Sequence, residues 1–167
     1  MTNNDILRRL RYTLNLSDNR LLAISKLGGS EVNHEQLQTW LKKEDDPDYS
    51  NCHDKQLAYF LNGLITQLRG QKEGEMPKAE KSLNNNLILK KLKIAFSLKA
   101  EDIIAILALA DFQLGKHELS AFFRRPDHKH FRQCKDQVLR NFLMGLQLKY
   151  RPKDKANQSS FIWPKHT

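Results

Sequence analysis

The sequence predicts an all-α protein made of two tandem four-helix repeats related by approximate two-fold symmetry. A constant offset of 82 residues aligns 3–69 with 85–151 without a gap, and 19 of the 67 pairs are identical. Apolar residues recur at spacings of three and four, and no useful length alternates with a period of two. Two separate helical units on a linker would be the alternative arrangement.

The offset divides the chain into a first helical repeat at 1–70, a linker at 71–84, a second repeat at 85–151 and a flexible tail at 152–167. The linker is rich in Lys and Glu, contains Gly and Pro, and is poor in large apolar groups, which predicts a solvated segment. The tail has the same character except for the run "FIW" at 161–163. We expect those three residues to dock on the helical body.

The first two helices of the first repeat are marked by apolar periodicity and by their ends. Apolar residues from Ile6 to Leu14 predict an amphipathic helix that ends near Asn15. Ser17 is a good N-cap for the second helix, because its hydroxyl can accept from a free backbone N–H. The glycines at 28–29 are expected to end that helix.

The third helix is predicted to begin at Asn33, with Gln36 completing a capping box. It would bury Leu37, Trp40 and Leu41. Together with the second helix it has the order of a DNA-binding helix-turn-helix, but the turn looks longer than the usual three or four residues. The aromatic and apolar side chains also fit a core better than a DNA groove.

The fourth helix is predicted in "CHDKQLAYFLNGLITQLRG", whose skeleton returns in the second copy as "CKDQVLRNFLMGLQLKYR". Asp54 and Asp136 fall in its first turn, where a capping carboxylate stabilises a helix by about 0.3–1 kcal/mol. Cys52 and Cys134 are expected to be small buried apolar groups, and the two thiols are too few for a disulfide framework.

Both copies also keep a glycine in the middle of the fourth helix, Gly63 and Gly145. Glycine there costs about 1 kcal/mol relative to alanine. Its retention in both copies predicts that another backbone passes close to the helix.

The formal charge of +9 is concentrated in the second repeat. Residues 1–70 hold nine basic and nine acidic side chains, whereas 85–151 hold thirteen basic and six acidic ones. The loops before the two fourth helices differ most sharply, since "KKEDDPDYSNCHD" in the first repeat becomes "RRPDHKHFRQCKD" in the second.

This basic loop is the candidate functional site, and its cations suit the phosphates of a nucleic acid or another polyanion, with an aromatic side chain available for stacking. A solvated loop that only aids solubility is the alternative. A further alternative is contact with an acidic protein, or with the acidic loop of a second copy, in a protein-interaction or assembly module. The candidate residues are Arg124, Arg125, His128, Lys129, His130, Phe131, Arg132 and Lys135.

The sequence gives little sign of chemistry. It contains no glycine-rich phosphate loop, nucleophile elbow, HExxH or CxxC. His128, His130 and Cys134 could be imagined as zinc ligands, but the first repeat does not preserve the set and no fourth ligand is evident. We therefore expect no metal, no cofactor and no enzymatic activity.

A cytoplasmic protein is expected, because no apolar run reaches the roughly 18 residues needed to cross a bilayer. The basic amphipathic segment at the N-terminus is interpreted as structural, since "NNLILKKLKIAF" at 85–96 nearly repeats it.

Several segments resemble the YehS-like family of small bacterial proteins, which consists of two copies of a domain of unknown function. The resemblance rests on "NNDILRRLRYTL", "TWLKKEDD", "FLNGLI" followed by Arg69 and Gly70, and the second-copy "LRNFLMGL", and it covers residues 1–151. It implies a duplicated all-helical fold in the bacterial cytosol and brings no catalytic residues with it.

Overall fold

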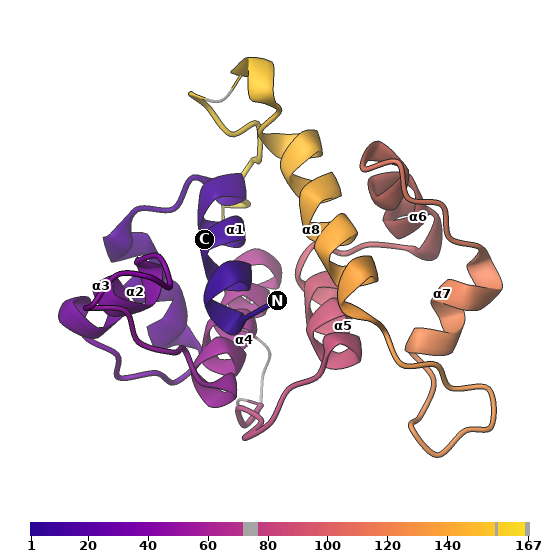
Figure 1. Ribbon diagram of the computed structural model, residues 1–167, viewed down its shortest axis with the longest axis horizontal. Helices are drawn as coiled ribbons and strands as arrows, with labels where there is room; N and C mark the ends of the chain where they lie inside the picture. The colour runs from indigo at the N-terminus through magenta and orange to yellow at the C-terminus, as the bar shows by residue number, and fades with distance from the viewer. Residues whose placement is uncertain (72–76, 156, 166–167) are drawn as a thin grey trace.

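The structure is a computed structural model that describes residues 1–71, 77–155 and 157–165 (Figure 1). All regular secondary structure in these ranges is helical, which confirms the predicted all-α class. The first repeat contains α1 (Asn3–Leu14), α2 (Asp18–Leu27), α3 (His34–Leu41) and α4 (Asp54–Arg69). The second contains α5 (Asn85–Ala95), α6 (Ala100–Leu109), α7 (Lys116–Phe122) and α8 (Asp136–Tyr150), and a short 3₁₀ turn follows at Lys153–Lys155.

The helix ends follow the local signals in the sequence. Ser17 accepts a hydrogen bond from the Arg20 amide at the start of α2, and Asn33 accepts one from the Gln36 amide at the start of α3. Asn15 ends α1 in the left-handed conformation, with φ of 52°. The N-caps and the end of the first helix are thus where the sequence predicts them.

The two repeats pack against each other reciprocally. The first helix of one repeat contacts the fourth helix of the other, so α1 lies against α8 and α5 lies against α4. One continuous apolar core includes fully buried leucines from all four of these helices, Leu10, Leu64, Leu92 and Leu146. These paired contacts are those that an approximate two-fold relation between the repeats requires.

Glycine lets the fourth helix of each repeat touch the backbone of the second helix. A Cβ placed on Gly63 would lie 1.8 Å from the carbonyl oxygen of Ile24 in α2. A Cβ on Gly145 would lie 2.0 Å from the carbonyl oxygen of Ile106 in α6. No methyl group fits at either distance, which confirms the close backbone approach predicted from these two glycines.

Parts of the tail pack on the helical body and touch both repeats. Phe161 meets Phe96 of the second repeat edge to face, with ring centroids 5.5 Å apart. The guanidinium of Arg20, in the first repeat, lies 4.7 Å from the centre of the Trp163 ring. Ile162 differs from its neighbours, because it is 85% exposed. The expected docking therefore applies to the two aromatic residues and is wrong for Ile162.

Substitution Gly63→Ala is expected to lower the free energy of unfolding by about 2–3 kcal/mol, since α2 and α4 must move apart and this outweighs the gain in helix propensity. Urea denaturation followed by circular dichroism measures the change. Gly115→Ala is the matched control, because a Cβ there meets only the flexible Glu118 side chain, at 3.3 Å. It should cost less than about 1 kcal/mol. Equal losses in both variants would contradict the close-packing argument.

Candidate functional site

The basic loop joins α7 to α8, and a buried side chain bonds to both of its ends, which a backbone hydrogen bond from Arg132 to Ala121 also joins. Asn86, at the start of α5, donates from Nδ2 to the carbonyl oxygens of Phe122 (3.0 Å) and Arg132 (2.8 Å). Its Oδ1 accepts from the Cys134 amide at 2.9 Å. The loop therefore leaves and rejoins the body at fixed points, and Figure 1 shows it projecting at the edge of the second repeat.

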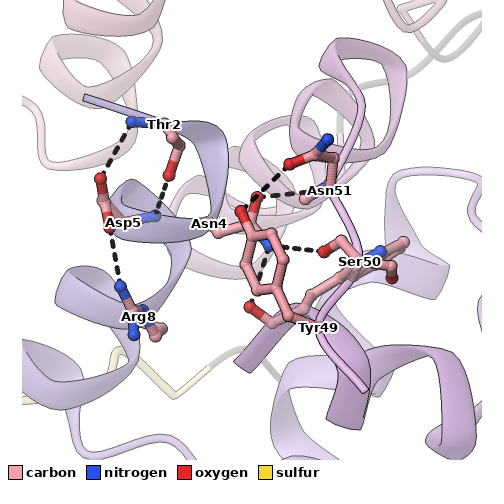
Figure 2. Close-up of polar contacts among 9 residues, drawn as sticks. Thr2, Asn4, Asp5, Arg8, Tyr49, Ser50 and Asn51 are labelled. Carbon is pink, nitrogen blue, oxygen red and sulfur yellow. Dashed lines mark hydrogen bonds and ion pairs between the residues drawn. The ribbon is translucent and has the colours of Figure 1, made fainter. Parts of the chain in front are cut away.

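The first repeat anchors its own loop in the same way. Asn4 donates to the carbonyl oxygens of Trp40 (3.1 Å) and Ser50 (2.9 Å), and it accepts from the Cys52 amide at 3.0 Å (Figure 2). Each loop is thus held by an equivalent asparagine, although the outward side chains of the two loops differ in charge. This shared support explains why both copies keep an asparagine at this position.

The aspartates of the fourth helices lie in the first turn, at the positive end of the helix dipole, as predicted. The hydrogen-bonding part of the predicted capping role is wrong, because the partners of both carboxylates lie outside their own helices. Neither α4 nor α8 has a side-chain cap hydrogen bond at its N-terminus. Asp136 Oδ1 accepts from Asn85 Nδ2 at 2.7 Å, and Oδ2 pairs with the Met1 ammonium at 3.2 Å. Asp54 accepts likewise from Asn3, at 2.7 Å. The hydrogen bond from Asn85, reinforced by the ammonium, lowers the pKa of Asp136.

The two cysteines are buried where the loops enter α4 and α8, as predicted. Loss of solvent raises the pKa of both thiols to about 12, and the charge of Asp54 or Asp136 acts in the same direction. Because these thiols remain neutral near pH 7, Cys52 and Cys134 pack as small apolar groups.

The cations of the basic loop face solvent and have few acidic partners. Among the described residues, the one salt bridge in the loop joins Arg125 to Asp127 at 3.1 Å, and both side chains are largely exposed. Arg124 is half-buried and donates to the His130 carbonyl oxygen at 3.5 Å. Phe131 is also half-buried, whereas the remaining candidates are exposed: His128, Lys129, His130, Arg132 and Lys135.

A groove of about 690 Å³ opens beside the loop, between α7 and the start of α8. Apolar and aromatic side chains form much of its lining, including Phe112, Leu114, Phe122 and Val138. Five basic side chains also line it, and Glu118 adds one carboxylate. Those five are His117, Arg124, His130, Arg132 and Lys135. The combination can hold an anion on the rim and a flat apolar group in the groove.

The structure brings four of the eight candidate residues to this groove, Arg124, His130, Arg132 and Lys135. The other four do not line it, and Phe131 is among them. Sequence reasoning missed His117 and most of the apolar lining, because these residues precede the loop in the chain. The unusual substitution of Ser30 in the first repeat by Phe112 in the second was the available signal.

The corresponding positions of the first repeat are bridged by polar side chains. Ser30 donates to Gln56 at 2.9 Å, where the second repeat has Phe112 and Val138. Thr39 and Ser50 also share a hydrogen bond between their hydroxyls. The apolar lining and the arginine rim are therefore specific to the second repeat.

The connection between α2 and α3 and the burial of α3 differ from those of a DNA-binding helix-turn-helix. Six residues, 28–33, separate the two helices, compared with the usual three or four. Leu37 and Trp40 of α3 are both buried. These side chains belong to the core and are not available to a DNA groove.

None of the helices in the described part of the chain is long and apolar enough to cross a bilayer. Within the same residues, no three His, Cys, Asp or Glu side chains are grouped as metal ligands.

The fold and the anchored loops define a class of protein, an all-α tandem duplication whose two copies share a core and differ in surface charge. The chain belongs to the family described as "Protein of unknown function (DUF1456)", whose sequence profile matches residues 3–70 and 85–151. It is 49% identical over 147 residues to "Uncharacterized protein YehS" of Escherichia coli strain K12, covering 87% of this chain and 94% of that protein. The resemblance seen in the sequence is thus confirmed. No solved structure matches significantly.

Both cysteines are expected to resist alkylation in the native protein at pH 8, because a raised pKa leaves almost no thiolate to react. In the unfolded chain, where a thiol has a pKa near 8.5, modification should be at least about a hundred-fold faster. Iodoacetamide labelling with and without urea, read by mass spectrometry, measures the ratio. Rapid native labelling of either thiol would show that the loop entry opens readily.

Proposed function

We propose that this cytoplasmic protein acts by binding, not by catalysis, and that it contacts nucleic acid through the basic loop of the second repeat. The observation that carries the proposal is the groove beside the loop, where Arg124, Arg132 and Lys135 surround an apolar lining. Arginine and lysine are the side chains that neutralise phosphates, and the release of their counterions drives binding.

The charges near the groove are available for a ligand. The second repeat has an excess of seven basic side chains, and one carboxylate, Glu118, lines the groove. Arg132 and Lys135 are exposed, so a phosphate can reach their charges directly from solvent. The anchored loop ends fix the backbone that carries these cations, which reduces the entropy that the loop loses on binding.

The groove favours single-stranded over duplex nucleic acid. Its volume of about 690 Å³ falls in the range of small-ligand sites, about 300–1,000 Å³. Phe112, Phe122 and Val138 offer an apolar surface to an unpaired base, and the cations lie beside it for the phosphate. A base-paired strand cannot present its bases in this way.

The quadruple variant Arg124→Ala, Arg125→Ala, Lys129→Ala and Arg132→Ala should abolish nucleic-acid retention in a gel-shift assay while leaving the helical content unchanged. If three or four phosphates are contacted, log K of the parent protein should fall with log salt at a slope of about −3. Lys42→Ala with Lys43→Ala, at the equivalent positions of the first repeat, is the control and should bind like the parent. A parent protein that retains neither DNA nor RNA at low salt would overturn the proposal.

Replacing the groove lining by its first-repeat equivalents tests the single-strand preference. The double variant Phe112→Ser and Val138→Gln should weaken binding of a single strand about ten-fold, which is the scale of one lost base contact, about 1–3 kcal/mol. Its affinity for duplex should not change, since the loop cations remain. Fluorescence anisotropy with both probes gives the comparison, and equal losses for the two probes would count against a base in the groove.

A second candidate function is protein assembly, and the opposite charge of the two loops favours it. Glu44, Asp45 and Asp48 are exposed in the first-repeat loop, which its asparagine holds as firmly as the basic loop is held. The acidic loop of one copy could therefore meet the basic loop of another. A dimer that dissociates as salt is raised, seen by light scattering, would support this function over nucleic-acid binding.

A further inference from the structure

Two grooves lie where the repeats meet, and they occupy equivalent positions. One is lined by residues of α1 and α8, the other by residues of α4, α5 and the linker, with volumes of about 630 Å³ and 320 Å³. Six of the nine residues that line the α1–α8 groove have an equivalent, 82 positions away, that lines the α4–α5 groove. The first groove can therefore be compared residue by residue with the second.

Residues of the protein's own linker form part of the wall of the α4–α5 groove. Pro77 and Glu80 lie along it, and a Glu80 carboxylate oxygen pairs with Lys91 Nζ at 3.0 Å. Lys91 is buried and also donates to Asn62 Oδ1 at 2.6 Å. A single carboxylate of the linker is thus held in this groove by a buried cation of α5.

In the α1–α8 groove, the equivalent cation has no carboxylate in an ion pair with it among the described residues. Arg9 stands at the position of Lys91 and donates to Gln147 Oε1 at 3.1 Å and to Met144 Sδ at 3.5 Å. Met144 in turn stands at the position of Asn62. Among the described residues no carboxylate forms an ion pair with Arg9, although it is half-buried.

Asp5, the carboxylate that acts on Arg9 electrostatically, is already engaged by other groups. Asp5 accepts from Arg8 at 2.7 Å and from the Thr2 amide at 3.0 Å, as part of the capping box of α1 (Figure 2). Arg140, an exposed residue of α8, adds another positive charge to the lining. The groove is therefore open and cationic.

We propose that the α1–α8 groove docks an extended acidic segment of a partner protein, one carboxylate of which pairs with Arg9 as Glu80 pairs with Lys91. The linker supports a peptide occupant, because its residues Pro77 and Glu80 line the equivalent groove beside a first and a fourth helix. Leu143, Met144 and Tyr12 supply apolar contact beside the charge. None of these residues lines the groove beside the basic loop, so the interaction is separate from nucleic-acid binding.

The probe is a synthetic N-acetylated peptide of residues 77–84 carrying Lys78→Glu and Lys81→Glu, titrated into the full-length, isotope-labelled protein by NMR. Saturable shifts are expected at backbone amides of α1 and α8. A second peptide with Glu80→Gln keeps the added negative charges and should bind at least about ten-fold more weakly, because it lacks the one charge-assisted pair. The quadruple loop variant should bind the first peptide normally.

Arg9→Gln should weaken binding of the first peptide to the same extent, and Lys26→Gln, which removes an exposed cation of α2, should not. Equal affinity for the two peptides, or shifts confined to residues 123–135, would overturn the proposal by showing non-specific charge attraction. Shifts at α1 and α8 caused by a single-stranded oligonucleotide but not by the peptide would assign the groove to nucleic acid and would also overturn it.

Discussion

The structure depends on one buried side chain in each repeat, Asn4 and Asn86, which are 1% and 7% exposed. Each makes three hydrogen bonds to backbone groups on both sides of a loop, and each unsatisfied group would cost about 1–3 kcal/mol. Because these bonds involve only backbone atoms of the loop, they do not depend on which side chains the loop carries. The same support therefore carries an acidic loop in one repeat and a basic loop in the other.

In both copies, the packing of the interior restricts the choice of residue more strongly than the surface does. At Gly63 and Gly145 a helix passes against another backbone, and any larger residue would separate the helices. The Ser30–Gln56 hydrogen bond of the first repeat, by contrast, is replaced by Phe112 and Val138 in the second. The replacement lies at the edge of the core, where it changes a polar bridge into an apolar groove lining without disturbing the packing of the helices.

Much of the fold could be predicted from the sequence, because the helix periodicity, the caps and the mid-helix glycines act locally and occur twice. The hydrogen-bond partner of Asp54 could not be predicted from the sequence, because Asn3 is 51 positions away. A carboxylate in the first turn of a helix suggests a capping residue instead. The basic loop could be recognised in the sequence by its charge. The groove could not, because part of its lining is Phe112, which precedes α7 in the chain and lies beside the loop only in the folded protein. The docking of Glu80 was equally hidden, because composition alone describes the linker as solvated.

The tail connects the two repeats and therefore affects how the protein unfolds. Ser159 donates to the Thr13 carbonyl oxygen at the end of α1, while Phe161 contacts Tyr150 at the end of α8. A strap that joins the last turns of two helices from different halves resists their separation. Together with the reciprocal packing of α1 on α8 and α5 on α4, it makes neither half a self-sufficient module. We expect the two repeats to unfold as one cooperative unit, because a single copy would expose to water the apolar residues that it now buries against the other.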